Sequence, residues 1–157
     1  MTDIKYNYTY SYDLSQEGNG VSIGAMPNHV VYKLFKDGRT ASRILEQYLP
    51  MWFENLTFVD KKGFDHIDQS GNKYDLKGFT ARGANFCPSS MLGAGRSFDI
   101  TEFQKHATSI DYIFSDITEF PKINIVFKHG AELLTTFPTG KIKKSDQKKL
   151  FKENDEE

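Results

Sequence analysis

The sequence predicts a single α/β domain with a mixed central sheet flanked by helices. A chain of 157 residues, of which 38% are hydrophobic and 14% aromatic, can bury one core but not two. Apolar residues at helical spacing alternate along the chain with short β-like runs, which is the pattern of an α/β fold. We therefore expect one domain over residues 1–140, followed by a charged C-terminal tail over residues 141–157.

The first half of the chain supplies an arm and a helix. Residues 1 to about 28 are rich in Tyr, Ser, Asn and Gly, and they are expected to form an edge strand or an arm. After the break at 37–38, Thr40 offers an N-cap for a helix running to Tyr48. Pro50 is expected to end or kink that helix.

The second half alternates strands with polar segments. Residues 63–77 read as strand, polar turn and strand, and residues 83–95 as a long loop of small and polar residues. A short helix follows over 100–107, capped by Asp99 or Thr101, and then an apolar strand over 110–114 that we place at the centre of the sheet. A further strand covers 123–127, and 131–137 is expected to be a strand or a short helix.

Composition excludes several classes of protein. The single cysteine, Cys87, leaves no intramolecular disulfide or cysteine-based zinc cluster and favours a reducing, cytoplasmic location. No apolar run approaches roughly 18 residues, so neither secretion nor membrane insertion is expected. A net charge of −1 gives no global basic character. Locally, however, residues 73–96 carry four positive charges against one negative charge, which indicates a phosphate-facing surface.

The strand-turn-strand segment brings three charged side chains together. In a strand, residues i and i+2 point to one face, so Asp75 and Lys77 are neighbours. With the turn centred near Ser70, residues whose numbers sum to about 140 lie opposite each other, which places Asp65 across from Asp75. Like charges directly opposite each other are destabilising unless a cation lies between them. The pattern therefore predicts a divalent cation held by Asp65 and Asp75.

This arrangement suits phosphodiester hydrolysis. Magnesium prefers hard oxygen ligands and keeps several waters, so two carboxylates and a substrate phosphate oxygen form a plausible coordination shell. Lys77 is positioned to orient or deprotonate the attacking water and to offset charge on the phosphate. The competing interpretation is a surface hairpin with a simple salt bridge.

The spacing Asp, ten positions, Asp-x-Lys resembles the PD-(D/E)XK nuclease superfamily. The segment is also similar to the site of the PvuII-type restriction endonucleases, Gly-x-Asp-x-Val-Asp-x-x-Gly-x-x-Tyr-Glu-Leu-Lys, with Ile67 and Asp75 as conservative departures. The matching residues are Gly63, Asp65, Asp68, Gly71, Tyr74, Leu76 and Lys77. The resemblance covers about fifteen residues. It implies a restriction-endonuclease-like fold and an endonuclease that cleaves duplex DNA, with Mg²⁺ (or Mn²⁺) as the cofactor.

The resemblance also suggests further site residues. Glu46, from the helix before the ribbon, is a candidate third metal ligand, and Asp68 is a rival to Asp65 that we assign to the turn instead. Members of the superfamily reach DNA through the segment after the motif strand. The DNA-binding candidates there are Arg82, Asn85, Ser89, Ser90 and Arg96, with phosphate contacts favoured over base contacts.

Other functions are compatible with the same residues. A restriction enzyme cutting palindromic duplex DNA is expected to be a homodimer. A homing or phage endonuclease and a Holliday-junction resolvase share this kind of metal site. A member of a different class, a DNA-binding or regulatory module without cleavage, would retain the fold with a coincidental Asp-x-Lys.

Overall fold

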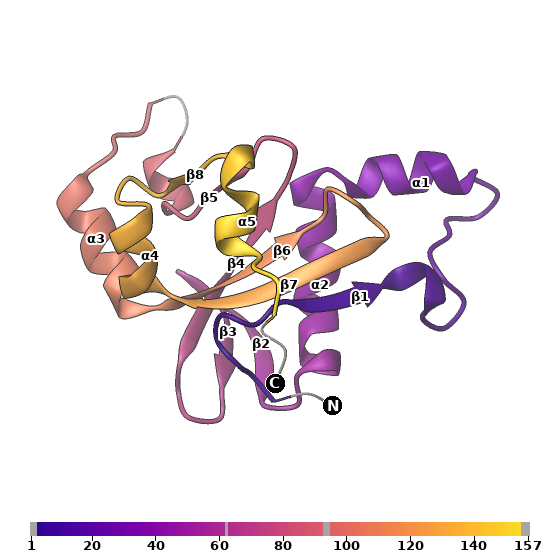
Figure 1. Ribbon diagram of the computed structural model, residues 1–157, viewed down its shortest axis with the longest axis horizontal. Helices are drawn as coiled ribbons and strands as arrows, with labels where there is room; N and C mark the ends of the chain where they lie inside the picture. The colour runs from indigo at the N-terminus through magenta and orange to yellow at the C-terminus, as the bar shows by residue number, and fades with distance from the viewer. Residues whose placement is uncertain (1–2, 62, 93–94, 155–157) are drawn as a thin grey trace.

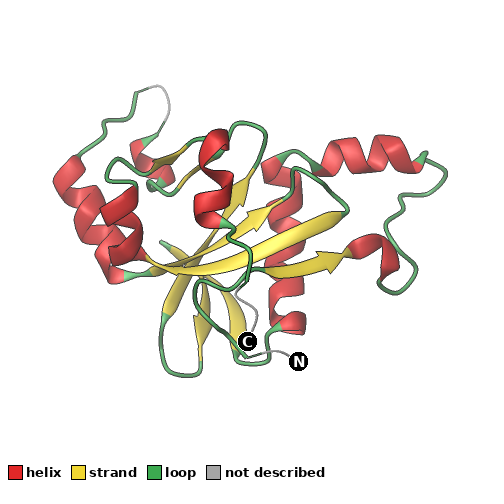
Figure 2. Ribbon diagram, viewed as in Figure 1, coloured by secondary structure: helices red, strands yellow, loops and turns green. Residues whose placement is uncertain are grey.

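A six-stranded mixed sheet organises the protein, as Figure 2 shows in yellow, and confirms the predicted mixed α/β class. The computed structural model describes residues 3–61, 63–92 and 95–154. The strand order is β1-β7-β6-β4-β3-β2, and only the β4–β6 pair is parallel within it. A second, two-stranded sheet pairs β5 with β8. The strands are β1 Tyr10–Asp13, β2 Leu56–Lys61, β3 Phe64–Asp68, β4 Lys73–Phe79, β5 Ala84–Asn85, β6 Asp111–Asp116, β7 Lys122–His129 and β8 Lys141–Ile142.

Helices cover both faces of the sheet and enclose two hydrophobic clusters. Helices α1 (Asn28–Phe35) and α2 (Gly38–Trp52) pack on one face, where Leu45 and Leu49 meet Tyr74 and Leu76 of β4. The opposite face carries α3 (Ile100–Ser109), α4 (Gly130–Thr136) and α5 (Gln147–Leu150), with α3 and α4 adjacent in Figure 1. Short 3₁₀ turns complete the chain at Leu14–Gln16, Ser89–Met91 and Lys144–Asp146.

Helix α2 differs from the prediction at both ends. Its N-cap is Asp37, whose carboxylate accepts a hydrogen bond from the Arg39 backbone N–H at 2.8 Å, so the helix begins before Thr40. Pro50 lies inside the helix and does not end it. Of the two N-cap candidates for α3, the cap is Asp99, which accepts hydrogen bonds from the backbone N–H groups of Thr101 and Glu102.

Strand β6 confirms the predicted central strand. It lies between β7 and β4, and Tyr112, Ile113 and Phe114 are fully buried. The next strand, β7, runs to His129, two residues past the strand expected over 123–127. Residues 130–136 then form a helix, which settles the choice between strand and helix for that segment.

The N-terminal segment and the segment that follows α5 lie beside each other (Figure 1). The N-terminal segment forms the edge strand β1, and the Thr9 N–H donates to Asn154 Oδ1 at 2.8 Å. The segment expected to be a charged tail is part of the core, because Ile142, Leu150 and Phe151 are buried in the hydrophobic cluster that also contains residues of α3 and α4. In the part of the chain that the structure describes, no helix has the length and apolar character needed to cross a membrane.

Candidate metal and phosphodiester site

The β3–β4 ribbon has the register that the sequence predicts. His66 pairs with Tyr74 and Ile67 with Lys73, so paired residue numbers sum to 140. Continuing this register places Asp65 opposite Asp75. The Asp65 carboxylate also accepts a hydrogen bond from the Leu76 backbone N–H at 3.1 Å, which holds it against β4. The ribbon therefore fixes both carboxylates by backbone geometry.

Strand parity separates the two faces of β4. Tyr74 and Leu76 are buried in the core beneath α2. Asp75 and Lys77 point to the opposite face, where the parallel neighbours on β6 are Tyr112 and Phe114. The charged residues thus lie on a floor of buried aromatic side chains, which lowers the local dielectric and strengthens electrostatic interactions.

A charged cluster forms where Asp65, Asp75 and Lys77 meet. Lys77 Nζ lies 3.1 Å from Asp75 Oδ2, and the side chains of the two residues are only 19% and 17% exposed. Burial raises the pKa of Asp75 to about 7, Lys77 opposes that rise, and the Asp65 carboxyl within hydrogen-bonding range adds to it. One ammonium therefore does not balance the two carboxylates, and near neutral pH the pair favours an additional proton or cation.

The donor set fits a magnesium ion that takes most of its ligands from elsewhere. Among the described residues, no group of three or more His, Cys, Asp or Glu side chains is arranged to hold a metal. Two adjacent carboxylates nevertheless provide the hard oxygen ligands that Mg²⁺ prefers, and Mg²⁺ commonly binds through one or two carboxylates, waters and substrate phosphates. Asp65 and Asp75 therefore fit a Mg²⁺ ion that would take its other ligands from water and substrate.

Glu46 lies beside this cluster on α2. Its side chain is 13% exposed, and Arg43 Nη1 lies 3.8 Å from its carboxylate. Burial raises the pKa of Glu46, and the nearby Asp65 raises it further. Glu46 and Asp65 line one groove, but Glu46 does not complete a metal-holding group of three within the described residues. Its role as a third metal ligand stays a prediction.

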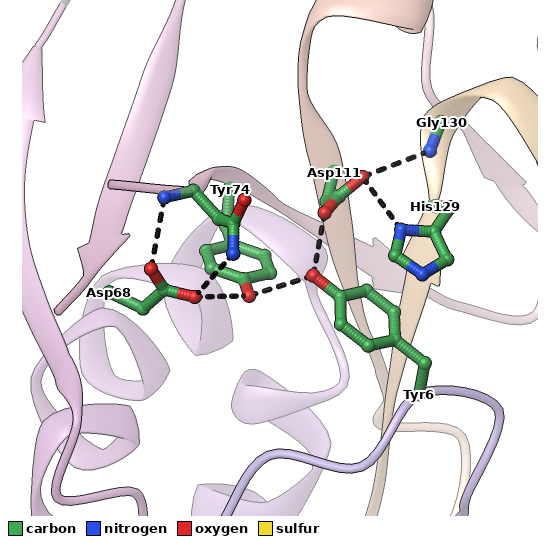
Figure 3. Close-up of polar contacts among 7 residues, drawn as sticks. Tyr6, Asp68, Tyr74, Asp111, His129 and Gly130 are labelled. Atoms are coloured by element: carbon green, nitrogen blue, oxygen red, sulfur yellow. Dashed lines mark hydrogen bonds and ion pairs between the residues drawn. The ribbon is translucent and has the colours of Figure 1, made fainter. Parts of the chain in front are cut away.

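Asp68 is engaged in the turn between β3 and β4. Its Oδ1 accepts hydrogen bonds from the backbone N–H groups of Ser70 and Asn72, both at 2.9 Å. Its Oδ2 accepts a hydrogen bond from Tyr74 Oη at 2.9 Å, as drawn in Figure 3. These bonds lower the pKa of Asp68. The carboxylate therefore serves the turn, as expected for aspartate at a turn entrance.

His66 supplies a hydrogen bond that α2 lacks. Pro50 has no N–H, so the Glu46 carbonyl loses its ordinary helix partner four residues along. His66 Nε2 donates to that carbonyl at 2.9 Å, from a fully buried ring. The hydrogen bond joins α2 to β3 directly beside Asp65. His66 Nδ1 has no partner within the described residues, which agrees with a neutral ring protonated at Nε2.

Two clefts meet at the charged cluster. One, of about 710 Å³, lies toward α3 and includes Asp65, Asp75, Lys77, Ser90, Glu102 and His106 in its wall. The other, of about 610 Å³, lies toward the start of α2 and is lined by Arg39, Ser42, Arg43, Glu46, Asp65 and Lys77, among others. Asp65 and Lys77 belong to both walls. A chain-like ligand crossing from one cleft to the other would pass over these two side chains.

The DNA-binding candidates fall in different places. Arg82 is exposed at the turn after β4, and Ser90 lines the larger cleft. Asn85 is used within the fold, because its Oδ1 accepts the Cys87 N–H at 2.8 Å. Arg96 is exposed and donates to the Leu92 carbonyl at 3.3 Å. The side chain of Ser89 lies outside the described part of the structure.

The clefts include side chains that sequence reasoning missed. Glu102 and His106 come from α3, and Arg39 and Arg43 from α2. Both pairs have the i, i+4 spacing that puts side chains on one face of a helix. That spacing was readable, but which face meets the ribbon depends on packing. Burial and the Lys77 charge lower the pKa of His106, which favours a neutral imidazole in the cleft.

Comparisons with known proteins leave the family open. No protein-family model matches the chain, and no curated protein matches it significantly.

Proposed function

We propose that this protein is a Mg²⁺-dependent endonuclease that hydrolyses phosphodiester bonds in duplex DNA, on a fold of the restriction-endonuclease type. The observation that carries the proposal is the position of Asp65, Asp75 and Lys77. They occupy one face of a rigid ribbon at the junction of two clefts. The resemblance of this segment to the PD-(D/E)XK motif supports the same reading.

Each residue has a role that its surroundings support. Asp65 and Asp75 would hold Mg²⁺. When bound, the ion would lower the pKa of a bound water and place a positive charge beside the phosphate. One ammonium proton of Lys77 is directed at Asp75, since Lys77 Nζ lies 3.1 Å from Asp75 Oδ2. The remaining protons can orient the attacking water and stabilise charge on the phosphate oxygens. The buried aromatic floor strengthens these interactions.

The two clefts suggest how a DNA strand would lie. Arg39 and Arg43 line one cleft, and Lys61 and Lys73 line the other. Cations on both sides of the cluster can neutralise successive phosphates, with the phosphate to be cut between them over Asp65 and Lys77. For a palindromic duplex, a homodimer would place one such site on each strand.

Cleavage assays test the proposal directly. Purified protein is incubated with plasmid, phage DNA and a four-way junction, with Mg²⁺, with Mn²⁺ or with chelator. We expect metal-dependent cutting by the wild type and none by Lys77→Ala, with the exposed Lys105→Ala as a matched control that cuts normally. A preference for the junction would assign a resolvase role. DNA binding without cutting on every substrate would instead support the non-cleaving module and contradict the proposal.

A further inference from the structure

A second basic cluster lies on the same face of the sheet, away from the ribbon. A cavity of about 220 Å³ opens between β7, α4, α5 and the N-terminal segment. Its wall contains three lysines, against one carboxylate. The polar side chains in the wall are Asn7, Lys128, Glu132, Thr136, Lys149 and Lys152.

Lys128 is the base of this cavity. The residue is only 8% exposed, and its ammonium donates to Asn7 Oδ1 at 2.8 Å. Within the described residues, no carboxylate lies within 4.0 Å of it. Buried charges in proteins are normally paired, because an isolated one is costly. A neutral amide oxygen is weak compensation for a buried ammonium.

The surrounding charges do not supply the missing partner. Burial lowers the pKa of Lys128, Lys152 lowers it further, and Glu132 only partly opposes them. Lys149 is 65% exposed at the rim and pairs with Asp146 at 3.2 Å. Lys152 is also exposed. The cavity therefore has a buried cation at its base and two exposed cations at its mouth.

The walls are held in place before any ligand arrives. Asn7 has a positive φ of 61°, and its N–H donates to the Phe127 carbonyl at 3.0 Å, which fixes its side chain against β7. The Thr9 hydroxyl donates to the Lys152 carbonyl at 2.7 Å. Both ends of the chain thus clamp the basic cluster, and a ligand would meet an ordered site.

We propose that this cavity binds a tetrahedral oxyanion, the phosphate group. Lys128 supplies a buried charge at the base, the Asn7 amide and the Thr136 hydroxyl offer neutral donors, and Lys149 and Lys152 add positive charge at the rim. The cavity, of about 220 Å³, has room for a phosphate group. The ligand is therefore free phosphate or the terminal phosphate of a larger molecule.

The oxyanion site is separate from the candidate metal site. Asp75, Tyr112 and Lys128 form one row across β4, β6 and β7, since Asp75 pairs with Tyr112 and Tyr112 with Lys128. Two strand spacings separate the ends of that row, about 10 Å between backbones. The buried aromatic ring of Tyr112 lies between them. The two sites share no wall residue.

Titration calorimetry with inorganic phosphate tests the proposal on the full chain without divalent metal. We expect one phosphate to bind per chain with saturation. In Lys128→Met, the affinity for phosphate should fall at least about tenfold. The rim variants Lys149→Gln and Lys152→Gln should weaken binding and, being exposed, should leave the fold intact. Lys36→Gln, an exposed lysine on the far face, and Lys77→Ala at the ribbon should bind like the wild type.

A pair of dinucleotides, identical except for a 5′-phosphate, identifies the source of the phosphate. Stronger binding of the phosphorylated one than of inorganic phosphate assigns the site to a terminal phosphate, and the reverse assigns it to the free anion. Three results would overturn the proposal: no phosphate binding by the wild type, binding unchanged in all three variants of Lys128, Lys149 and Lys152, or binding abolished by Lys77→Ala.

Discussion

At the scale of single residues, Asp75 is the most informative group. Its carboxyl is buried and lies between a cation, Lys77, and a second carboxyl, Asp65, and burial outweighs the cation. The sequence predicted this grouping because strand parity and hairpin register are both simple periodicities. It did not predict the burial beside β6, a strand distant in the chain. The height of the Asp75 pKa was therefore beyond sequence reasoning.

The Asp75 pKa predicts how Mg²⁺ affinity depends on pH. Burial raises this pKa from 3.8 to about 7, so below pH 7 a proton competes with the metal. Affinity should rise by up to about tenfold per pH unit as the pH approaches 7, and then level off. Calorimetric titration with Mg²⁺ between pH 5.5 and 8.5 measures this. A flat profile for the wild type would contradict the assignment of Asp75 as a ligand, and Asp75→Asn should bind weakly at every pH.

The same shift predicts the stability of the metal-free protein. The folded state keeps a proton on Asp75 up to about pH 7, whereas the unfolded chain loses it near 3.8. The contribution of Asp75 to the free energy of unfolding should therefore fall as the pH rises from about 4 to about 7 and stay constant above. Urea unfolding of the wild type and Asp75→Asn across this range checks it: the difference between them should grow in favour of Asp75→Asn with rising pH.

At the scale of elements, hydrogen bonds hold the β3–β4 ribbon at its turn and at Tyr74. Asp68 closes its turn, and Tyr74 joins that carboxylate to Tyr6, whose hydroxyl donates to Asp111 at 2.6 Å (Figure 3). The ring of Tyr6 also stacks on His129 with centroids 3.8 Å apart. The hairpin and the role of Asp68 were predictable from local turn chemistry. The link to Tyr6 was not, because it joins residues far apart in the sequence.

The α2–β3 connection through His66 gives an element-scale prediction. His66→Phe keeps an aromatic ring in the core but leaves the Glu46 carbonyl, already without a helix partner at Pro50, unsatisfied. We expect a loss of about 1–3 kcal/mol in the free energy of unfolding, measured by urea denaturation. The double variant His66→Phe/Pro50→Ala should recover part of the loss, since the helix then supplies its own N–H. Equal stability of the single and double variants would contradict this account.

At the scale of the whole molecule, function is expected where helices from both faces reach the ribbon. Cleft-lining side chains come from α2 on one side and from α3 on the other. The sequence indicated these helices, but their rotation against the sheet depends on contacts between distant segments. Because such contacts are not visible in the sequence, the C-terminal segment was predicted to be a charged tail. Its lysines are exposed, and the three residues that anchor it, Ile142, Leu150 and Phe151, are too few to show a periodicity.

The cleft beside α2 predicts a role for its arginines in DNA binding. Arg39→Gln/Arg43→Gln removes two exposed cations from the wall that Asp65 and Lys77 share. We expect weaker DNA binding at all sequences. The salt dependence of the binding constant should also decrease, by the amount that corresponds to about two fewer phosphate contacts. Fluorescence anisotropy with Asp75→Asn as the cleavage-deficient background, at several salt concentrations, measures both. An unchanged slope would place the DNA elsewhere.

A contrast between two neighbouring aspartates shows whether Asp65, Asp75 and Lys77 form a nuclease centre. Cleavage of plasmid DNA with Mg²⁺ is compared for the wild type, Asp65→Asn and Asp68→Asn, with circular dichroism to verify folding. We predict that Asp65→Asn stays folded and loses cleavage, whereas Asp68→Asn loses stability but still cuts at a temperature where it is folded. Retained cutting by Asp65→Asn, with loss of cutting by folded Asp68→Asn, would contradict the account.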